Sequence, residues 1–421
     1  MRFNLNWKPH KVFYGWWIIA ACFLIALYTG GVIFYGFTAI FEPLINEFDW
    51  SYTQVSFAAS LRGLEMGLLA PVVGILTDRW GPRRLIFAGA IITGLGLLLL
   101  SQTSSIGMLY GAFILVALGM SASSATVLTT AVANWFHKKI SLASGIMICG
   151  YGFSGLLVPL IVNLIDSYGW RMSIDILAIG MFVICLPLSL VMRHKPEQYG
   201  YLPDGEVKDV STQENDTGMK QVLEVNAKPV QALKSGFFWH IALALACQSM
   251  ALSAVITHVM PFLGSVGFSR TTSALIASGI PLVSIAGRLG IGALGDRHDK
   301  IWVTAGCFAL MSLGLLCFGF LSFTNSWLLI PFLILFSIGY GGNNTMRVSL
   351  LRETFGRQHF GSIHGFTIGI MMLGTIAGPP LAGYIFDTRG SYQLIWFIFS
   401  GLAVAALTII ITTPKNSTQT I

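Results

Sequence analysis

Arg288 lies inside an apolar run that begins near Thr272, where a charged residue is unexpected. An arginine at the centre of a membrane helix costs about 2.5–3.5 kcal/mol on insertion scales, so a compensating group is needed. Asp296 is about two helical turns away, at the edge of the run. A guanidinium stays protonated and offers a planar fork that matches a carboxylate. We predict that Arg288 binds a small carboxylate; the alternative is a helix-end carbonyl or a partner from another helix.

Three further charged residues fall well within apolar runs. Arg62 and Glu65 are three positions apart on one helix face and can pair with each other, which would make them structural. Arg347 either extends to the lipid headgroups or lines the same ligand site as Arg288.

His258 is a candidate for binding and releasing a proton within the apolar segments, because an imidazole titrates near neutral pH. The alternative is a hydrogen-bonded packing residue. Glu65, with its neighbour Arg62, is the other proton-coupling candidate. His364 lies closer to the membrane surface and is a weaker one.

Tyrosines and asparagines at mid-helix positions could wall a cavity, since a phenol can donate to a carboxylate while its ring excludes water. Tyr28 and Tyr35 are seven residues apart and share a helix face. Ordinary packing is the alternative for each tyrosine. Besides Arg288 and Arg347, the predicted substrate-binding residues are Tyr28, Tyr35, Tyr151, Tyr340 and Asn343, with Asn344 beside them.

The composition is that of a multi-pass, all-α membrane protein. Of the 421 residues, 54% are hydrophobic and 10% are charged, and the mean hydropathy is +0.73. Apolar runs of about 20 residues, enough to cross a bilayer, recur along the chain. We predict twelve transmembrane helices at 13–37, 53–76, 85–103, 108–132, 142–165, 173–192, 237–263, 272–294, 302–323, 328–350, 362–385 and 393–413.

Charge asymmetry between the connecting segments predicts that both termini are cytoplasmic. Segments on the side of the amino terminus hold 19 Lys and Arg, whereas those on the other side hold three: Arg171, Arg270 and Arg389. This bias follows the positive-inside rule for a protein of the cell membrane. The net charge of +7 then reflects topology, and no nucleic-acid partner is expected.

The chain divides into two similar halves. We predict a cytoplasmic N-terminus at 1–12, a six-helix bundle at 13–192, a cytoplasmic linker at 193–236, a second six-helix bundle at 237–413 and a cytoplasmic tail at 414–421. Gly74, Asp78 and Arg79 map onto Gly292, Asp296 and Arg297 with a constant shift of 218. Such a parallel repeat implies two bundles related by an axis along the membrane normal.

The stretch GILTDRWGPRR from Gly74, with its weaker copy GALGDRHDKIW from Gly292, resembles the signature loop of the major facilitator superfamily. The resemblance implies the fold of that superfamily: two pseudo-symmetric six-helix bundles. We expect the loop to act as a conformational switch, through contacts that exist in only one state; the alternative is a basic topology anchor. The switch residues are Gly74, Asp78, Arg79, Gly81, Arg83, Arg84, Asp296 and Arg297.

Three stretches are similar to the monocarboxylate transporters and the oxalate/formate antiporters: YGWW at 14–17, WFHKKISLASGI at 135–146 and YGWR at 168–171. Arg288 stands where both families carry an anion-binding arginine. The resemblance implies transport of a monocarboxylate such as lactate or pyruvate. Ser284 replaces the aspartate of the animal carriers, and a lysine is missing both from 32–37 and from 366–378. The last absence argues against oxalate.

These features predict a secondary transporter that moves a small carboxylate by alternating access, by proton symport or by anion exchange, and that functions as a monomer in the lipid bilayer. No cofactor, metal or enzymatic activity is expected; GYGFSG at 150–155 lies within a helix and follows no strand. Two alternatives stay open. One is a carrier of another solute, such as an efflux pump with internally paired arginines, and the other is a non-transporting membrane sensor.

Overall fold

The computed structural model describes residues 13–61, 63, 68–136, 140–194, 196–199, 228–355 and 360–413. Every regular element in these ranges is helical. Apolar segments favour this outcome, because a helix satisfies its backbone hydrogen bonds within the segment.

The first group of helices covers the amino-terminal part of the chain. Two of its elements are short π-helical stretches, which often mark functional positions in a helix. In chain order the elements are α1 (Tyr14–Thr29), η1 (Gly30–Tyr35, π), α2 (Phe37–Phe48), α3 (Tyr52–Ser60), α4 (Ala70–Trp80), α5 (Pro82–Ser101), α6 (Ile106–Ser121), α7 (Ala125–Trp135), α8 (Ile140–Phe153), η3 (Ser154–Leu156), α9 (Leu157–Gly180), η4 (Met181–Cys185, π) and α10 (Leu186–Val191).

The second group follows the short 3-10 helix η5 (Pro196–Tyr199). Its helices are longer and less interrupted than those of the first group. They are α11 (Pro229–Lys234), α12 (Gly236–Val266), α13 (Arg270–Gly295), α14 (Lys300–Gly319), η7 (Ser326–Leu328), α15 (Leu329–Phe355), α16 (Phe360–Arg389) and α17 (Gln393–Ile411).

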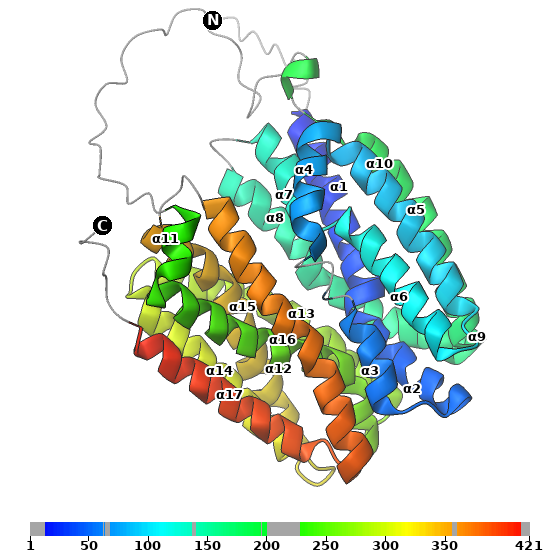
Figure 1. The fold of residues 1–421 in the computed structure, drawn as a ribbon. Coiled ribbons are helices and arrows are strands. Elements are labelled where there is room, and N and C mark those ends of the chain that lie inside the picture. Colours follow the sequence, from blue (N-terminus) through cyan, green and yellow to red (C-terminus); the bar gives the residue numbers. More distant parts are fainter. Residues whose placement is uncertain are drawn as a thin grey trace, which may run out of the picture.

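Figure 1 shows these two groups side by side, with α1–α10 in blue to green and α12–α17 in green to red. The start of α1 and the end of α17 lie at the same end of the molecule, which we call the terminal end. The opposite end holds α2, the start of α3 and the end of α16, and we call it the far end (Figure 1).

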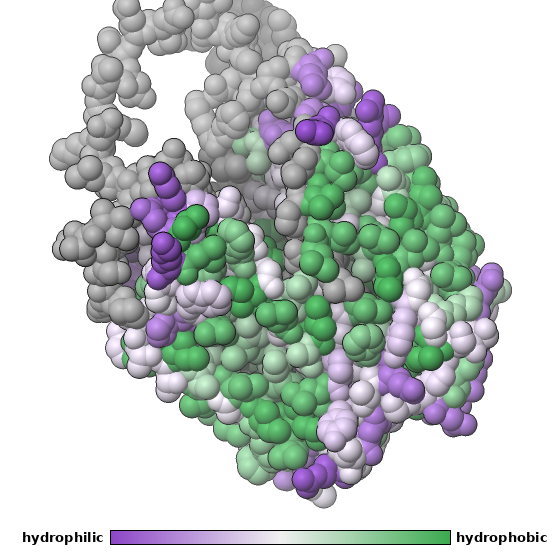
Figure 2. Space-filling view, viewed as in Figure 1, coloured by the Kyte–Doolittle hydropathy of each residue, from purple (hydrophilic) through white to green (hydrophobic). Residues whose placement is uncertain are grey.

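Among the described residues, ten stretches are long and apolar enough to cross a membrane. Hydrophobic side chains cover the middle of the face seen in Figure 2, and hydrophilic side chains gather at its two ends. Large apolar side chains such as Leu160, Val183 and Leu313 are more than half exposed, as expected for lipid-facing positions. The chain is a multi-pass membrane protein.

The helices match the predicted positions closely, with informative differences at two places. The first predicted helix, 13–37, continues through η1 and α2 to Phe48. The segments predicted at 142–165 and 173–192 follow each other without a gap in Ala143–Val191, but they stay two helices, separated at Gly169, which has φ 77° and ψ 163°. This backbone conformation favours glycine and bends the chain there. Twelve crossings and cytoplasmic termini stay predictions.

Helices of the two groups pack together on two sides of the boundary, among them α8 with α13 and α3 with α16. On one side Gly155 lies against Pro281 of α13, and Gly152 lies against Ile285. On the other side α3 packs on α16, where a Cβ at Gly383 would lie 2.7 Å from the backbone of Tyr52. Small residues of this kind let membrane helices approach closely.

Both pairs separate toward the terminal end. Gly145 is about two turns before Gly152 on the same face of α8, and a Cβ there would meet no described atom within 4 Å. On α16, Gly369 is about two turns before Ile376, which contacts Gly63. A Cβ at Gly369 would also meet no described atom within 4 Å. The described helices therefore contact one another across the boundary at the far end and at mid-depth, and diverge beyond.

Candidate functional site

Arg288 is held at mid-depth by a close contact between α13 and α15. A Cβ at Gly341 would collide with the carbonyl oxygen of Ser284 and would lie 3.1 Å from the backbone nitrogen of Arg288. A Cβ at Gly287 would likewise collide with the backbone of Ile338. These glycines let the two helices touch and set the depth at which Arg288 leaves α13.

The guanidinium of Arg288 makes only weak contacts. Its Nη1 lies 3.5 Å from the carbonyl oxygen of Ile148 on α8, and its Nη2 lies 3.4 Å from the hydroxyl of Tyr340. Both distances are long for hydrogen bonds. Its Nε is buried and has no hydrogen-bond partner in the described part of the chain. The contact with the Ile148 carbonyl agrees with the alternative that Arg288 has a partner from another helix. It leaves most of the hydrogen-bond donors of Arg288 unused.

No carboxylate among the described residues pairs with Arg288. Among the described residues the ion pairs are Glu47–Arg171, Asp166–Arg270 and Lys300–Glu353. Because a guanidinium remains charged, the site keeps a positive charge that these residues do not neutralise. The geometry suits a small anion.

Two tyrosines from the two groups flank Arg288. Tyr35 is 5% exposed at the end of η1, and Tyr340 is 7% exposed on α15. Tyr35 lies close enough to Arg288 and Tyr340 to interact electrostatically with both. The π-helical stretch can approach α8 and η3 because Gly30 lies against Ser154. The structure thus brings together Tyr35, Tyr340 and Arg288, as predicted candidates for one site.

Arg347 belongs to the same electrostatic neighbourhood. Arg347 lies within electrostatic range of Arg288 and of the Tyr340 hydroxyl. Its Nη1 lies 3.1 Å from Sδ of Met371 on α16, and its buried Nε has no hydrogen-bond partner. The guanidinium therefore contacts a neighbouring helix, whereas the alternative of extension to the headgroups would require it to face lipid.

Asn343 is fully buried, and its Nδ2 lies 3.7 Å from Sδ of Met311 on α14. Its Oδ1 has no hydrogen-bond partner. Asn344, the next residue, is half-buried. Asn343 thus contacts the interior of the second group.

The other two tyrosines lie deeper in the first group. Tyr28 donates its hydroxyl to the carbonyl of Leu177 at 2.8 Å and packs against Gly180, which favours the packing alternative for this residue. Tyr151 is half-buried on α8, with its ring 3.2 Å from the position of a Cβ at Gly30. Tyr151 is therefore next to the stretch that carries Tyr35.

His258 lies toward the far end, fully buried between the groups. Its Nε2 is 3.0 Å from both the Pro379 carbonyl and the Ser56 hydroxyl, and its Nδ1 is 3.0 Å from the Tyr392 hydroxyl. A carbonyl only accepts, so we assign the hydrogen to Nε2, and Nδ1 accepts from Tyr392. Since Ser56 belongs to α3, the neutral imidazole links the two groups.

Several predicted residues lie wholly or partly outside the described part. Arg62 and Glu65 are outside it, whereas Gly74 and Asp78 are described only by their position in α4. In the signature loop, Gly81 has φ 76° and turns the chain from α4 into α5. The charged residues of the loop and of its copy are exposed: Arg79, Arg83, Arg84, Asp296 and Arg297. The switch role of this loop stays a prediction.

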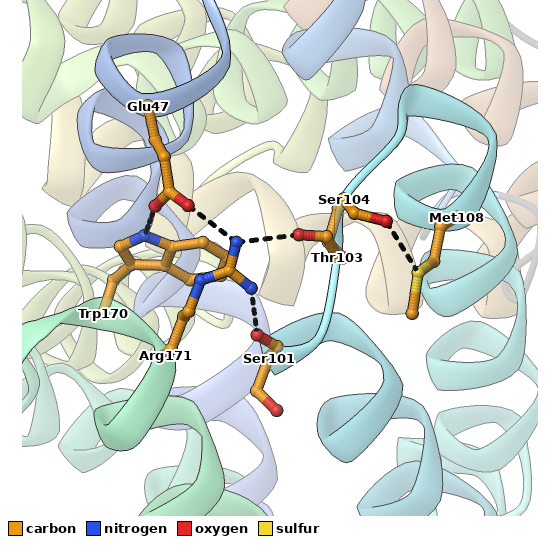
Figure 3. Close-up of polar contacts among 7 residues, drawn as sticks. All are labelled: Glu47, Ser101, Thr103, Ser104, Met108, Trp170 and Arg171. Atoms are coloured by element: carbon orange, nitrogen blue, oxygen red, sulfur yellow. Dashed lines mark hydrogen bonds and ion pairs between the residues drawn. The ribbon is translucent and has the colours of Figure 1, made fainter.

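The YGWR stretch builds a clamp that the sequence did not reveal (Figure 3). The Glu47 carboxylate accepts from Trp170 Nε1 at 2.6 Å and from Arg171 Nη2 at 2.7 Å. Arg171 also donates to the carbonyls of Ser101 and Thr103, at 2.6 and 2.9 Å. The clamp ties the end of α2 to the connection between α5 and α6, so this motif is structural in the first group.

Two of the groups that touch the arginines were also missed, the Ile148 carbonyl and the Met371 thioether. A backbone carbonyl has no residue-type signal, and a methionine on an apolar helix cannot be distinguished from packing. Only the paired helices show that they face Arg288 and Arg347.

A family model described as Major Facilitator Superfamily matches residues 17–322 and 259–420. The chain therefore belongs to the major facilitator superfamily, whose members are transporters and not enzymes. The fold agrees: a mutant of the nucleoside transporter NupG superposes with a TM-score of 0.74 at 14% identity, covering 96% of this chain and all of that one. A bacterial homologue of the lysosomal transporter Spinster, inward-facing and unoccupied, gives 0.66 at 15% identity, covering 96% of both chains.

Within the superfamily, the chain is similar to monocarboxylate transporters. It is 24% identical to monocarboxylate transporter 4 of Gallus gallus, over 94% of this chain and 82% of that protein. It is 23% identical to monocarboxylate transporter 7 of Homo sapiens, over 95% and 86%. The predicted resemblance to this family is confirmed.

Proposed function

We propose that the protein is a secondary transporter that carries a small monocarboxylate, of the lactate or pyruvate class, across the membrane. The observation that carries this proposal is the Arg288 guanidinium at the boundary between the groups, without a described carboxylate partner. A bidentate pair with a carboxylate would satisfy its unused donors. The similarity to monocarboxylate transporters supports the same substrate class.

Tyr35 and Tyr340 allow a bound anion to contact both helix groups. Tyr35 comes from the first group, and Tyr340 and Arg288 come from the second. An anion between them would contact both groups at once, so its binding energy can favour the state in which the boundary is closed around it. Rocking of the groups about this site is the alternating-access mechanism that we propose.

For the driving force, we propose either proton symport or exchange of one anion for another. His258 is the described candidate for a coupled proton, because it is an ionisable group at a boundary that must open during the cycle. Opening at the far end would separate His258 from Ser56 and expose the imidazole to water. Exchange would need no titrating group.

The test is uptake of labelled pyruvate and lactate into proteoliposomes. Arg288→Ala should abolish uptake, and Arg288→Lys should leave weak uptake, because a lysine cannot form the bidentate pair. Arg352→Ala is the matched control, since Arg352 is an exposed arginine at the end of α15. Normal uptake by the Arg288→Ala protein would refute the proposal.

A further inference from the structure

Two guanidiniums, those of Arg288 and Arg347, lie near the boundary without a carboxylate partner among the described residues. Arg288 and Arg347 interact electrostatically, and both have a buried Nε without a hydrogen-bond partner. Neither belongs to an ion pair with a described residue. A monoanion bound to Arg288 would compensate one of these charges and leave the other at membrane depth, which is unfavourable.

The spacing of the two arginines limits which ligand can reach both. Gly341 lies beside the backbone nitrogen of Arg288, so the two residues are at the same depth. Arg347 is six residues beyond Gly341 on α15, which corresponds to about 9 Å along the helix axis. This is a separation along the backbone, and the long arginine side chains cover part of it. A chain with an anionic group at each end can contact both guanidiniums, whereas a monocarboxylate such as pyruvate can form a charged pair with only one of them.

The present contact of Arg347 leaves it available for such a group. Its Nη1 faces the thioether of Met371, which is a weak hydrogen-bond acceptor. Methionine is also flexible and adapts to a new neighbour. A carboxylate would replace this contact with a charge-assisted one.

We propose that the site also binds linear dicarboxylates of four or five carbons, with one carboxylate on Arg288 and the other on Arg347. This inference rests on the proposed function, because it takes Arg288 as the first anion ligand. Arg347 then determines specificity: it distinguishes a dicarboxylate from a monocarboxylate of the same length. The four-carbon pair succinate and butyrate isolates this difference, since they differ in one terminal group.

The experiment measures binding of succinate, butyrate and pyruvate to the purified full-length protein by calorimetry. Succinate should bind the unaltered protein at least about 10-fold more tightly than butyrate, because a second charged pair is formed. Arg347→Gln should weaken succinate binding more than butyrate or pyruvate binding and thereby remove this preference. Arg347→Lys should keep part of it. Thermal unfolding of each variant verifies that it is folded.

Each outcome separates the two proposals. Equal affinity for succinate and butyrate in the unaltered protein, or equal weakening of all three acids by Arg347→Gln, would overturn the dicarboxylate inference while pyruvate binding still supports the proposed function. If none of the acids binds, both proposals fail. If Arg288→Gln removes pyruvate binding and Arg347→Gln removes only the succinate preference, both are supported.

Discussion

The carboxylate of Asp166 on α9 lies 3.1 Å from Nε of Arg270, the first residue of α13, and thereby joins the two helix groups at the far end. Asp387 stands near the position equivalent to Asp166 in the second half of the chain and makes the reciprocal contact. Its carboxylate accepts from the backbone nitrogens of Tyr52 and Thr53, the first two residues of α3, at 3.0 and 2.9 Å. Each group thus sends one carboxylate to the start of a helix in the other group, where anions are favoured.

Replacing Asp387 should loosen the far end. Asp387→Asn removes the charge that caps α3, and loss of a helix cap costs about 0.5–2 kcal/mol, so the closed population should fall roughly 2- to 30-fold relative to the open one. Distances between spin labels at Ser104 and Thr324 would report the shift. Asp175→Asn is the control, since Asp175 makes no described contact across the boundary. An unchanged distance distribution would show that this cap does not hold the end closed.

The clamp around Arg171 should stabilise the first group. Arg171→Ala removes two bonds to backbone carbonyls and the pair with Glu47, and we expect a loss of about 1–3 kcal/mol of unfolding free energy. The ion pair contributes little of this, because both side chains are about 40% exposed. Thermal unfolding in detergent measures the effect. A double variant with Glu47→Gln should cost less than the sum of the single variants; strict additivity would argue against a shared clamp.

The hydroxyl of Tyr340 should contribute to ligand affinity. Tyr340→Phe keeps the ring against Arg288 but removes the group that lies 3.4 Å from Nη2, so the half-saturating pyruvate concentration should rise roughly 2- to 10-fold with the maximal rate nearly unchanged. Concentration-dependent uptake into proteoliposomes measures both quantities. Tyr384→Phe serves as the control because Tyr384 is 58% exposed. A lower maximal rate at constant half-saturation would mean that Tyr340 acts in the conformational step instead.

The His258→Gln variant should distinguish proton symport from anion exchange. If it carries the coupled proton, His258→Gln will lose uptake driven by an imposed pH gradient and will retain exchange of labelled for unlabelled pyruvate. Glutamine can preserve a hydrogen bond to Pro379 or Ser56, which limits structural damage. His240→Gln, at the other end of α12, is the matched control. Retention of gradient-driven uptake by the His258→Gln protein would assign coupling to another group or to exchange.

Hydropathy alone placed most helices, because a membrane segment must be apolar over a fixed length and must satisfy its own backbone. The π-helical turn before Tyr35 and the bend at Gly169 were not foreseen as such, since both depend on how close a neighbouring helix approaches or on the path of the chain. For the site, residue type identified Arg288 as a charge in need of a partner. Residue type also suggested Tyr28 as a binding residue, but its hydroxyl donates to the carbonyl of Leu177 within the first group.

The amino-acid sequence by itself determined that this is a multi-pass membrane protein of the major facilitator superfamily with an arginine at membrane depth, since apolar length, the repeated DR loop and a permanent charge are properties of residue type and order. Only the tertiary structure decided which groups face that charge. Arg288 meets a carbonyl of α8 and a phenol of α15, while Arg347 meets Met371, because these contacts arise where separate helices pack. Helix packing depends on small residues and side-chain shapes across long separations in the chain, and no local pattern encodes it.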